Sequence, residues 1–302
     1  MRAVPDILEL VVTCCGEGAA DVRRLSPTKR GLHLLLVVPL DPNTEYEMTL
    51  NMAHLRRHWV LAALLLVVGG WYLRDLFAAR PVEAQTLAGI HGDRSRIMLG
   101  FRVKSGAVQA RLPVPWQLHP VHNGPLQGAN FIVVLVDRVR DDDPEGKPKS
   151  RGAGKIINFV APAKHPQTAQ TASIILSGWA SNPDNVPGFF QVYRAATIRV
   201  EQLIKSQEGD MEEATDVWEV RDATGSGGLE LRLRSRRQLS ARTRVRGEVQ
   251  ALSAKDPALW RLHRFDAATD VVKSVPEGSD RVLHYTFHLT APGYDTLLNG
   301  SE

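Results

Sequence analysis

Cysteine is nearly absent from this sequence of 302 residues: Cys14 and Cys15 are adjacent, and no cysteine follows them. Neighbouring cysteines rarely bridge each other, because the small ring that they would close is strained. The chain beyond Cys15 therefore has no cysteine metal site and no thiol nucleophile, and it suits an oxidising compartment. The patterns G-x-S-x-G, Walker A and G-x-G-x-x-G are also missing, which removes the commoner hydrolase, nucleotide and dinucleotide classes.

Neither sign of charge is in large excess, since 37 basic residues face 33 acidic ones and the net charge is +4. So small a surplus does not require an anionic partner. The densest basic feature is an arginine run within residues 232–246. It is either a solvated strand face with its turn, or a surface that contacts anionic lipid headgroups. No aromatic residues lie between the arginines, so nucleic-acid binding is not expected.

Long hydrophobic runs are missing except for one, residues 59–73, which are fifteen residues without a charge. A helix that spans a bilayer needs about 20 apolar residues, so this run is short. Its length matches a signal-peptide core, or an anchor whose flanking Arg57 and Arg74 reach the interfaces. A buried core helix is the alternative. We expect a signal or anchor helix within residues 52–80, a membrane bilayer as partner, and a cleavage candidate after Ala84.

Basic residues are concentrated before this run, where Arg56 and Arg57 precede it, while the segment that follows balances its charges. Because positive flanks stay in the cytoplasm, the C-terminal part of the chain is expected on the other side of the membrane. In a bacterium, that predicts an inner-membrane protein that faces the periplasm. Cleavage after Ala84 would make it a periplasmic or secreted protein.

The position of the hydrophobic run in the chain is unusual for an export signal. A chain that starts at Met52 would carry a conventional basic segment followed by an apolar core. This indicates three regions: an extension at residues 1–51 outside the native protein, a signal or anchor helix at 52–80, and a β-rich extracytoplasmic domain at 81–302. Alternatively, residues 1–51 are a genuine cytoplasmic segment with a strand at 32–40.

Helical periodicity is scarce beyond Gln85, where the hydrophobic pattern has a period of two. Turn signals rich in glycine and proline separate the runs, which favours an antiparallel closed or cone-like barrel, with a β-sandwich as the alternative. Two short helices are expected at 257–264 and 291–298. The expected strands are 96–103, 129–139, 155–163, 172–179, 196–201, 216–221, 229–237 and 281–289.

Metal-binding patterns are incomplete. His119 and His122 have a suitable spacing, but they lie among prolines and no third ligand is apparent. Residues 141–146 resemble the start of an EF-hand loop, but Gly152 stands where a bidentate Glu is needed. We therefore expect a polar hairpin turn at 141–146, no metal and no cofactor.

Two segments carry a family resemblance. Gly128-Ala129-Asn130-Phe131 begins a long strand, and Ser181-Asn182-Pro183-Asp184-Asn185-Val186-Pro187-Gly188-Phe189-Phe190-Gln191 comes later. Over residues 110–302 this looks like a remote relative of the acetoacetate decarboxylase superfamily. The resemblance implies a cone-like β-barrel around a ligand cavity. In that family, a lysine in a Gly-aromatic-Pro-Lys turn forms a Schiff base with the substrate ketone.

At the corresponding turn this chain has Gly188-Phe189-Phe190-Gln191. If the two turns correspond, an amide replaces the amine and Gln191 cannot form an imine. The other interpretation is that Pro187-Gly188 is simply a tight turn.

The preferred functional hypothesis is a barrel that binds a small apolar or lipid-like ligand without chemistry of its own. One alternative is an enzyme acting on a β-keto acid or related carbonyl compound, with a buried lysine or with Asp137 and Arg138. Another is a structural envelope interaction protein. We expect the ligand to contact Trp116, Trp179, Phe189, Phe190 and Tyr193, with Gln191 and Arg194 as polar contacts.

Overall fold

The computed structural model describes residues 9–14, 90–143, 147–148, 154–183, 189–207, 209–294 and 297–298. All of them belong to one compact unit, which comprises residues 1–23 and 87–302. The expected anchor at 59–73 and the alternative strand at 32–40 lie outside the described residues. Within the described ranges, no helix is long and apolar enough to cross a membrane.

Strands dominate the described residues, as the period-two pattern predicts, and all eight expected strands are present. The strands are β1 (Glu9–Cys14), β2 (Ile90–Phe101), β3 (Gln117–Leu118), β4 (Phe131–Asp142), β5 (Gly154–Lys164), β6 (Thr171–Ala180), β7 (Tyr193–Ser206), β8 (Met211–Asp222), β9 (Gly228–Gln238), β10 (Thr243–Ser253), β11 (Trp260–Ser274), β12 (Ser279–Asp280) and β13 (Val282–Thr290).

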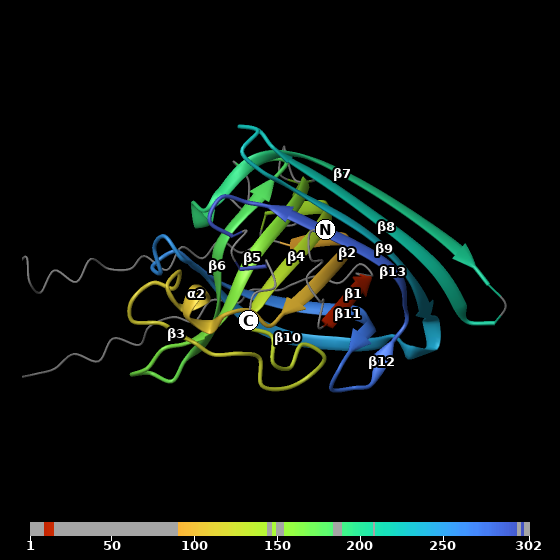
Figure 1. Cartoon of the computed structure of the whole chain (residues 1–302), viewed down its shortest axis with the longest axis horizontal. Coiled ribbons are helices and arrows are strands. Elements are labelled where there is room, and N and C mark those ends of the chain that lie inside the picture. Colours follow the sequence, from red (N-terminus) through yellow and green to blue (C-terminus); the bar gives the residue numbers. More distant parts are fainter. Residues whose placement is uncertain are drawn as a thin grey trace, which may run out of the picture. The chain divides into compact units, whose positions relative to one another are not determined.

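These strands form one large mixed sheet, and the closed barrel that the sequence analysis favoured is not confirmed. Most neighbours are antiparallel. The exceptions are at β6, which pairs in parallel with β10 through 173–175 and with β7 through 178–180. On its other side β6 pairs with β5 along most of its length. One group of strands in the sheet comprises β7, β8, β9 and β13, and the other comprises β1 to β5 with β10 and β11. β6 is the junction between these two groups (Figure 1).

The main core lies between these two groups. In Figure 1, β7, β8, β9 and β13 run across β4 and β5. The facing side chains form one buried cluster, with Phe131 from β4, Phe159 from β5, Trp218 from β8 and Phe287 from β13. Burying each such aromatic side chain contributes about 1.5–3 kcal/mol, so this cluster holds the two groups together.

Alternation along β9 follows the sequence pattern. Leu229, Leu231 and Leu233 are buried in the core, and the residues between them are exposed. β4 differs, because Val136 on its second face is also buried. A strand covered on both faces reads as a continuous apolar run, as residues 131–136 do.

Both expected short helices are wrong where the structure describes them. β11 begins at Trp260 within the expected helix 257–264, and Ala291–Tyr294 form a turn. A single helical turn has little stability of its own, whereas β11 gains a ladder of ten paired positions with β10. The described α-helix, α2 (Ser105–Gln109), was not expected.

Candidate functional site

Charged side chains are buried where β2 and β4 pair. Asp93 on β2 lies opposite Arg138 on β4, and Asp141 and Asp142 follow at the end of β4. A buried charge is costly unless it is paired and hydrogen-bonded, so such a group calls for a physical reason.

The Asp93 carboxylate forms ion pairs with two arginines. Arg96 Nη2 lies 2.6 Å from Asp93 Oδ2, and Arg138 Nε lies 3.3 Å from Oδ1. Burial alone would raise the pKa of the Asp93 carboxyl, but the positive charges of Arg96 and Arg138 lower it below its usual value. Asp93 is therefore ionised at neutral pH and neutralises part of the local positive charge.

Five arginines have a buried donor without an acceptor among the described residues, namely Arg96, Arg138, Arg237, Arg242 and Arg261. Arg138 and Arg261 are the two that lie near Tyr193 and His263. The side chain of Arg138 is only 9% exposed, and its Nη1 has no hydrogen-bond partner. Arg261 on β11 has a buried Nε in the same condition. Burial lowers the pKa of the Arg261 guanidinium to about 10, so it stays charged at neutral pH.

Two neutral ionisable side chains, those of Tyr193 and His263, also lie near these arginines. Burial raises the pKa of the Tyr193 phenol, which donates a hydrogen bond to Asn158 Oδ1. Burial, together with the positive charges of the neighbouring His91, Arg96, Arg138 and Arg261, lowers the pKa of His263 to about 3.

We call Arg138, Arg261, Tyr193, His263 and Asn158 the arginine cluster. The two guanidinium charges each influence the pKa values of Tyr193 and of His263, which places the four ionisable groups within one short-range electrostatic neighbourhood. The cluster therefore offers cationic and neutral hydrogen-bond donors.

An apolar surface adjoins the arginine cluster. Phe190 packs with Ile175 and Ala251 in a small second core, against which Phe189 and Tyr193 also pack. The Arg261 guanidinium lies over the Phe189 ring, 4.1 Å from its centroid. Such stacking orients a guanidinium without occupying its hydrogen-bonding edge.

The expected pocket residues fall into separate places. Phe189, Phe190 and Tyr193 lie together beside Arg261. Gln191 lies between Phe190 and Tyr193 in the sequence but is exposed, with a φ of 55°. Trp116 is in the main core, next to His165.

Trp179 and Arg194 form a different unit with Asp222. Trp179 Nε1 donates to Asp222 Oδ2 over 2.8 Å, Arg194 Nη1 lies 3.1 Å from the same oxygen, and Thr224 donates to Oδ1. Burial alone would raise the pKa of Asp222, but these hydrogen bonds lower it to about 2. Both oxygens of the Asp222 carboxylate thus have hydrogen-bond partners within the protein, as expected for a structural residue. The Trp179 N–H is used in this contact and is not available to a ligand.

Asp137 and Arg138 do not form the pair that the enzyme hypothesis named. Asp137 contacts Arg94 at 3.2 Å and Lys155 at 3.6 Å, whereas Arg138 contacts Asp93. Adjacent residues of a strand point to opposite faces, so the two side chains diverge. Lys155 thus shares a site with Asp137 rather than with the arginine cluster.

Among the described residues, no three potential ligands are grouped so as to hold a metal. The rings of His119 and His122 contact each other, with 3.3 Å between His122 Nε2 and His119 Nδ1. Asp143 and Lys147 pair across the turn between β4 and β5, as expected for a hairpin. The burial of Asp141 and Asp142 at its base was not expected.

Sequence reasoning missed Arg261 and His263. Both lie in the segment that was expected to be helical, and their alternation on β11 brings them to one face of the sheet. Arg261 and His263 are two positions apart in the sequence. If residues 260–264 had been assigned to a strand, this spacing would have predicted that both side chains lie on the same face.

No protein-family model matches this sequence, and a search of curated proteins finds no match. Among solved structures, the enduracididine biosynthesis enzyme MppR, complexed with the condensation product of pyruvate and imidazole 4-carboxaldehyde, has a TM-score of 0.36 at 9% identity. That match covers 70% of this chain and 87% of the MppR chain. An acetoacetate decarboxylase-like enzyme from Sphingomonas wittichii RW1 has a TM-score of 0.35 at 10% identity, covering 70% and 92%. The weak resemblance stated from the sequence is thus found again, and it assigns no activity or residue role to this chain.

Proposed function

We propose that the β-rich domain binds a small carboxylate ligand, of the class of β-keto acids and related carbonyl compounds, at the arginine cluster. One observation carries this proposal: Arg138 and Arg261 retain buried N–H groups with no acceptor among the described residues. Buried donors require an acceptor, and arginine forms its strongest hydrogen bonds with carboxylates.

This proposal changes the ligand that the sequence analysis preferred. An apolar or lipid-like ligand would leave Arg138 Nη1 and Arg261 Nε buried without an acceptor, which is unfavourable. The second core around Phe190 supplies apolar contacts for the short carbon chain of a keto acid. The neutral His263 supplies a hydrogen-bond partner for a carbonyl oxygen without adding charge.

Titration calorimetry with acetoacetate tests the proposal. We expect acetoacetate to bind to the full chain and its methyl ester to bind far more weakly, because the ester has no charge for the arginines. Arg261→Gln should weaken acetoacetate binding about tenfold or more, since a hydrogen bond to a charged group contributes about 1.5–3 kcal/mol.

Arg246→Gln is the matched control, because Arg246 is an exposed arginine on β10 that pairs with Asp266. It should leave the affinity unchanged. Equal binding of acetoacetate and its ester, or an unchanged affinity in the Arg261→Gln variant, would contradict the proposal.

Turnover of a β-keto acid is the second candidate function, favoured by the charges of Arg138 and Arg261 near the neutral His263. When the bond to the carboxylate breaks and CO₂ leaves, the electron pair moves to the carbonyl oxygen as an enolate. Cationic and neutral donors stabilise such an oxyanion. Release of CO₂ from acetoacetate tests this step, and an adduct trapped on a lysine by borohydride would instead indicate Schiff-base chemistry.

Delivery to a membrane belongs to the same proposal. The run at residues 59–73 supports an anchor or export signal that places the domain in the periplasm. Separation of soluble and membrane fractions of the native host, followed by N-terminal sequencing, tests both the location and the cleavage after Ala84.

A further inference from the structure

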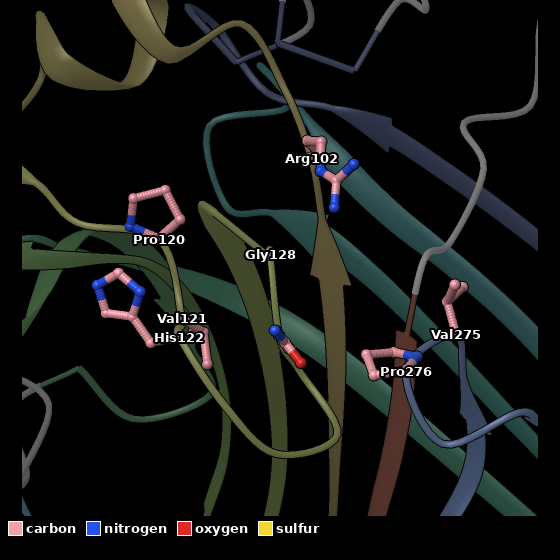
Figure 2. A pocket seen from close by; sticks show the side chains of 8 residues that line it. Arg102, Pro120, Val121, His122, Gly128, Val275 and Pro276 are labelled. Atoms are coloured by element: carbon pink, nitrogen blue, oxygen red, sulfur yellow. The ribbon is translucent and has the colours of Figure 1, made fainter.

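A surface cleft of about 520 Å³ lies at the end of β2 that is distant from the arginine cluster. Figure 2 shows Arg102, which follows β2, with Val275 and Pro276 to one side and His122 to the other. Arg138 lies opposite Asp93, and Arg102 is nine positions further along the extended chain than Asp93, which is about 30 Å. The cleft is therefore a separate site.

The wall of the cleft is held by backbone hydrogen bonds. The N–H of Gly128 donates to the carbonyl of Val121 over 2.8 Å, and the N–H of Val121 donates to the carbonyl of Ala129 over 3.0 Å. Ser274 Oγ donates to the carbonyl of Pro125 over 3.2 Å, which ties this loop to the end of β11. The cleft is thus formed before any ligand binds, which limits the entropy cost of binding.

Arg102 is the cation of the cleft, and it has no ion pair among the described residues. A Cβ at residue 128 would lie 2.5 Å from Arg102 Nη2, and the φ of Gly128 is +93°. L side chains rarely adopt this backbone conformation, which favours glycine here, and the missing Cβ leaves room for the flexible end of the Arg102 side chain. Gly128 thereby lets the guanidinium lie against the loop, inside the cleft.

The remaining walls are largely apolar. Val275 is 64% exposed beside Pro276, and Val121 lies across from them. The ring of His122 is held against His119 and completes one wall. Ligand sites commonly combine apolar walls with one or two polar groups that orient the ligand.

We propose that this cleft binds an aliphatic monocarboxylate, with its carboxylate against Arg102 and its short chain against Val121, Val275 and Pro276. A single guanidinium matches one carboxylate. A phosphate would favour several donors, and a purely apolar ligand would make no hydrogen bond with the exposed Arg102 guanidinium. The proposal does not depend on the function assigned to the arginine cluster.

Methyl-resolved NMR of the full-length chain with hexanoate tests this site, because Val121 and Val275 carry reporter methyl groups. We expect their signals to shift with hexanoate, while those of Val133 in the main core do not. Arg102→Gln should weaken binding at least about fivefold, as expected for loss of a charged hydrogen-bond partner. Lys104→Gln, which changes an exposed cation outside the cleft, should have no effect.

Further probes separate the possible outcomes. Hexanamide tests the charge and inorganic phosphate tests the aliphatic chain, and both should shift the two methyl signals much less than hexanoate. Equal shifts with either probe, no shift with hexanoate, or an unchanged affinity in the Arg102→Gln variant would overturn the proposal. Loss of the hexanoate shifts in Arg261→Gln would overturn it too, because it would place the effect in the arginine cluster.

Discussion

At the scale of single residues, this protein buries charge more often than its sequence pattern indicates. Arg237, from the arginine run that was interpreted as a solvated face or a lipid contact, is fully buried and lies 2.5 Å from Asp216. Its neighbours Arg232 and Arg234 are exposed. Arg237 is buried because the neighbouring strand β8 supplies Asp216 as its partner, and amino-acid composition does not reveal such a partner.

His263 should make the protein sensitive to mild acid. The pKa of His263 is about 3 in the folded protein and 6.5 in the unfolded chain. As the pH falls below 6.5, the unfolded chain therefore binds a proton at His263 that the folded protein does not bind. The free energy of unfolding should therefore decrease between pH 7 and pH 5, by roughly 2 kcal/mol from this group. Urea unfolding of wild type and His263→Gln at both pH values measures it.

In the His263→Gln variant, the loss of stability between pH 7 and pH 5 should be smaller by about this amount. His288→Gln, which changes an exposed histidine on β13, should behave as wild type. An identical pH dependence in all three proteins would show that His263 is not held neutral.

Asp222 should be a stability residue. Asp222→Ala removes the acceptor of the buried Trp179 N–H and the partner of Arg194. Leaving these groups unsatisfied should cost about 2–4 kcal/mol in the free energy of unfolding. Denaturant unfolding measures the loss. Asp280→Ala, which removes an exposed partner of Lys273, should cost under about 1 kcal/mol, and a similar cost at both positions would contradict the structural role.

At the scale of elements, periodicity predicted the strands that have one buried and one exposed face better than the strands that are rich in charged residues. β9 and β13 alternate, and their buried faces agree with the sequence pattern. β10 and β11 were missed because their charged residues occupy much of each strand, as in residues 242–248 and 261–266. Their pairing with each other and with β6 and β1 stabilises them, and such long-range partners are not encoded in a local pattern.

The junction of β5, β6 and β7 should depend on Gly178. A Cβ there would lie 2.3 Å from the carbonyl oxygen of Ile157 and 2.5 Å from the Tyr193 ring. Gly178→Ala should lower the free energy of unfolding by about 2 kcal/mol or more, because the backbone cannot yield easily. It should also displace Tyr193 from Asn158, which a change in tyrosine fluorescence or NMR would report.

Gly106→Ala is the matched control for that substitution. Gly106 lies in α2, and a Cβ there would have nothing within 4 Å. Alanine should leave the stability unchanged or raise it by up to about 1 kcal/mol, since it favours helix more than glycine does. Equal effects of the two substitutions would show that the junction is not tightly packed.

At the scale of the whole molecule, the sheet includes a strand from far upstream in the sequence. β1 pairs with β11 on one side and with β2 on the other. Residues 9–14 lie within the segment that the sequence analysis interpreted as an extension outside the native protein. A start at Met52 stays a prediction, and the position of β1 provides a direct test of it.

A chain that starts at Met52 would lack β1 and leave the facing edges of β2 and β11 unpaired. It should be less stable than the full chain by at least about 3 kcal/mol, since a net hydrogen bond contributes about 1 kcal/mol and β1 is paired on both sides. Val11→Pro in the full chain should act in the same direction. Equal stability of the full chain and the Met52 chain in urea would support the start at Met52.

The amino-acid sequence by itself determined the class of the fold and eight of its strands, because a period of two in hydrophobicity directly states which residues of a strand must be buried. It also placed Phe189, Phe190 and Tyr193 in one neighbourhood, because they are close in the chain. Tertiary structure alone decided that Arg261, on a strand about 70 residues later, stacks on Phe189, and that Arg138 turns away from Asp137 toward Asp93. The physical reason is that burial of a charge is settled by the partners that distant strands bring to it, and those partners are known only once the sheet is assembled.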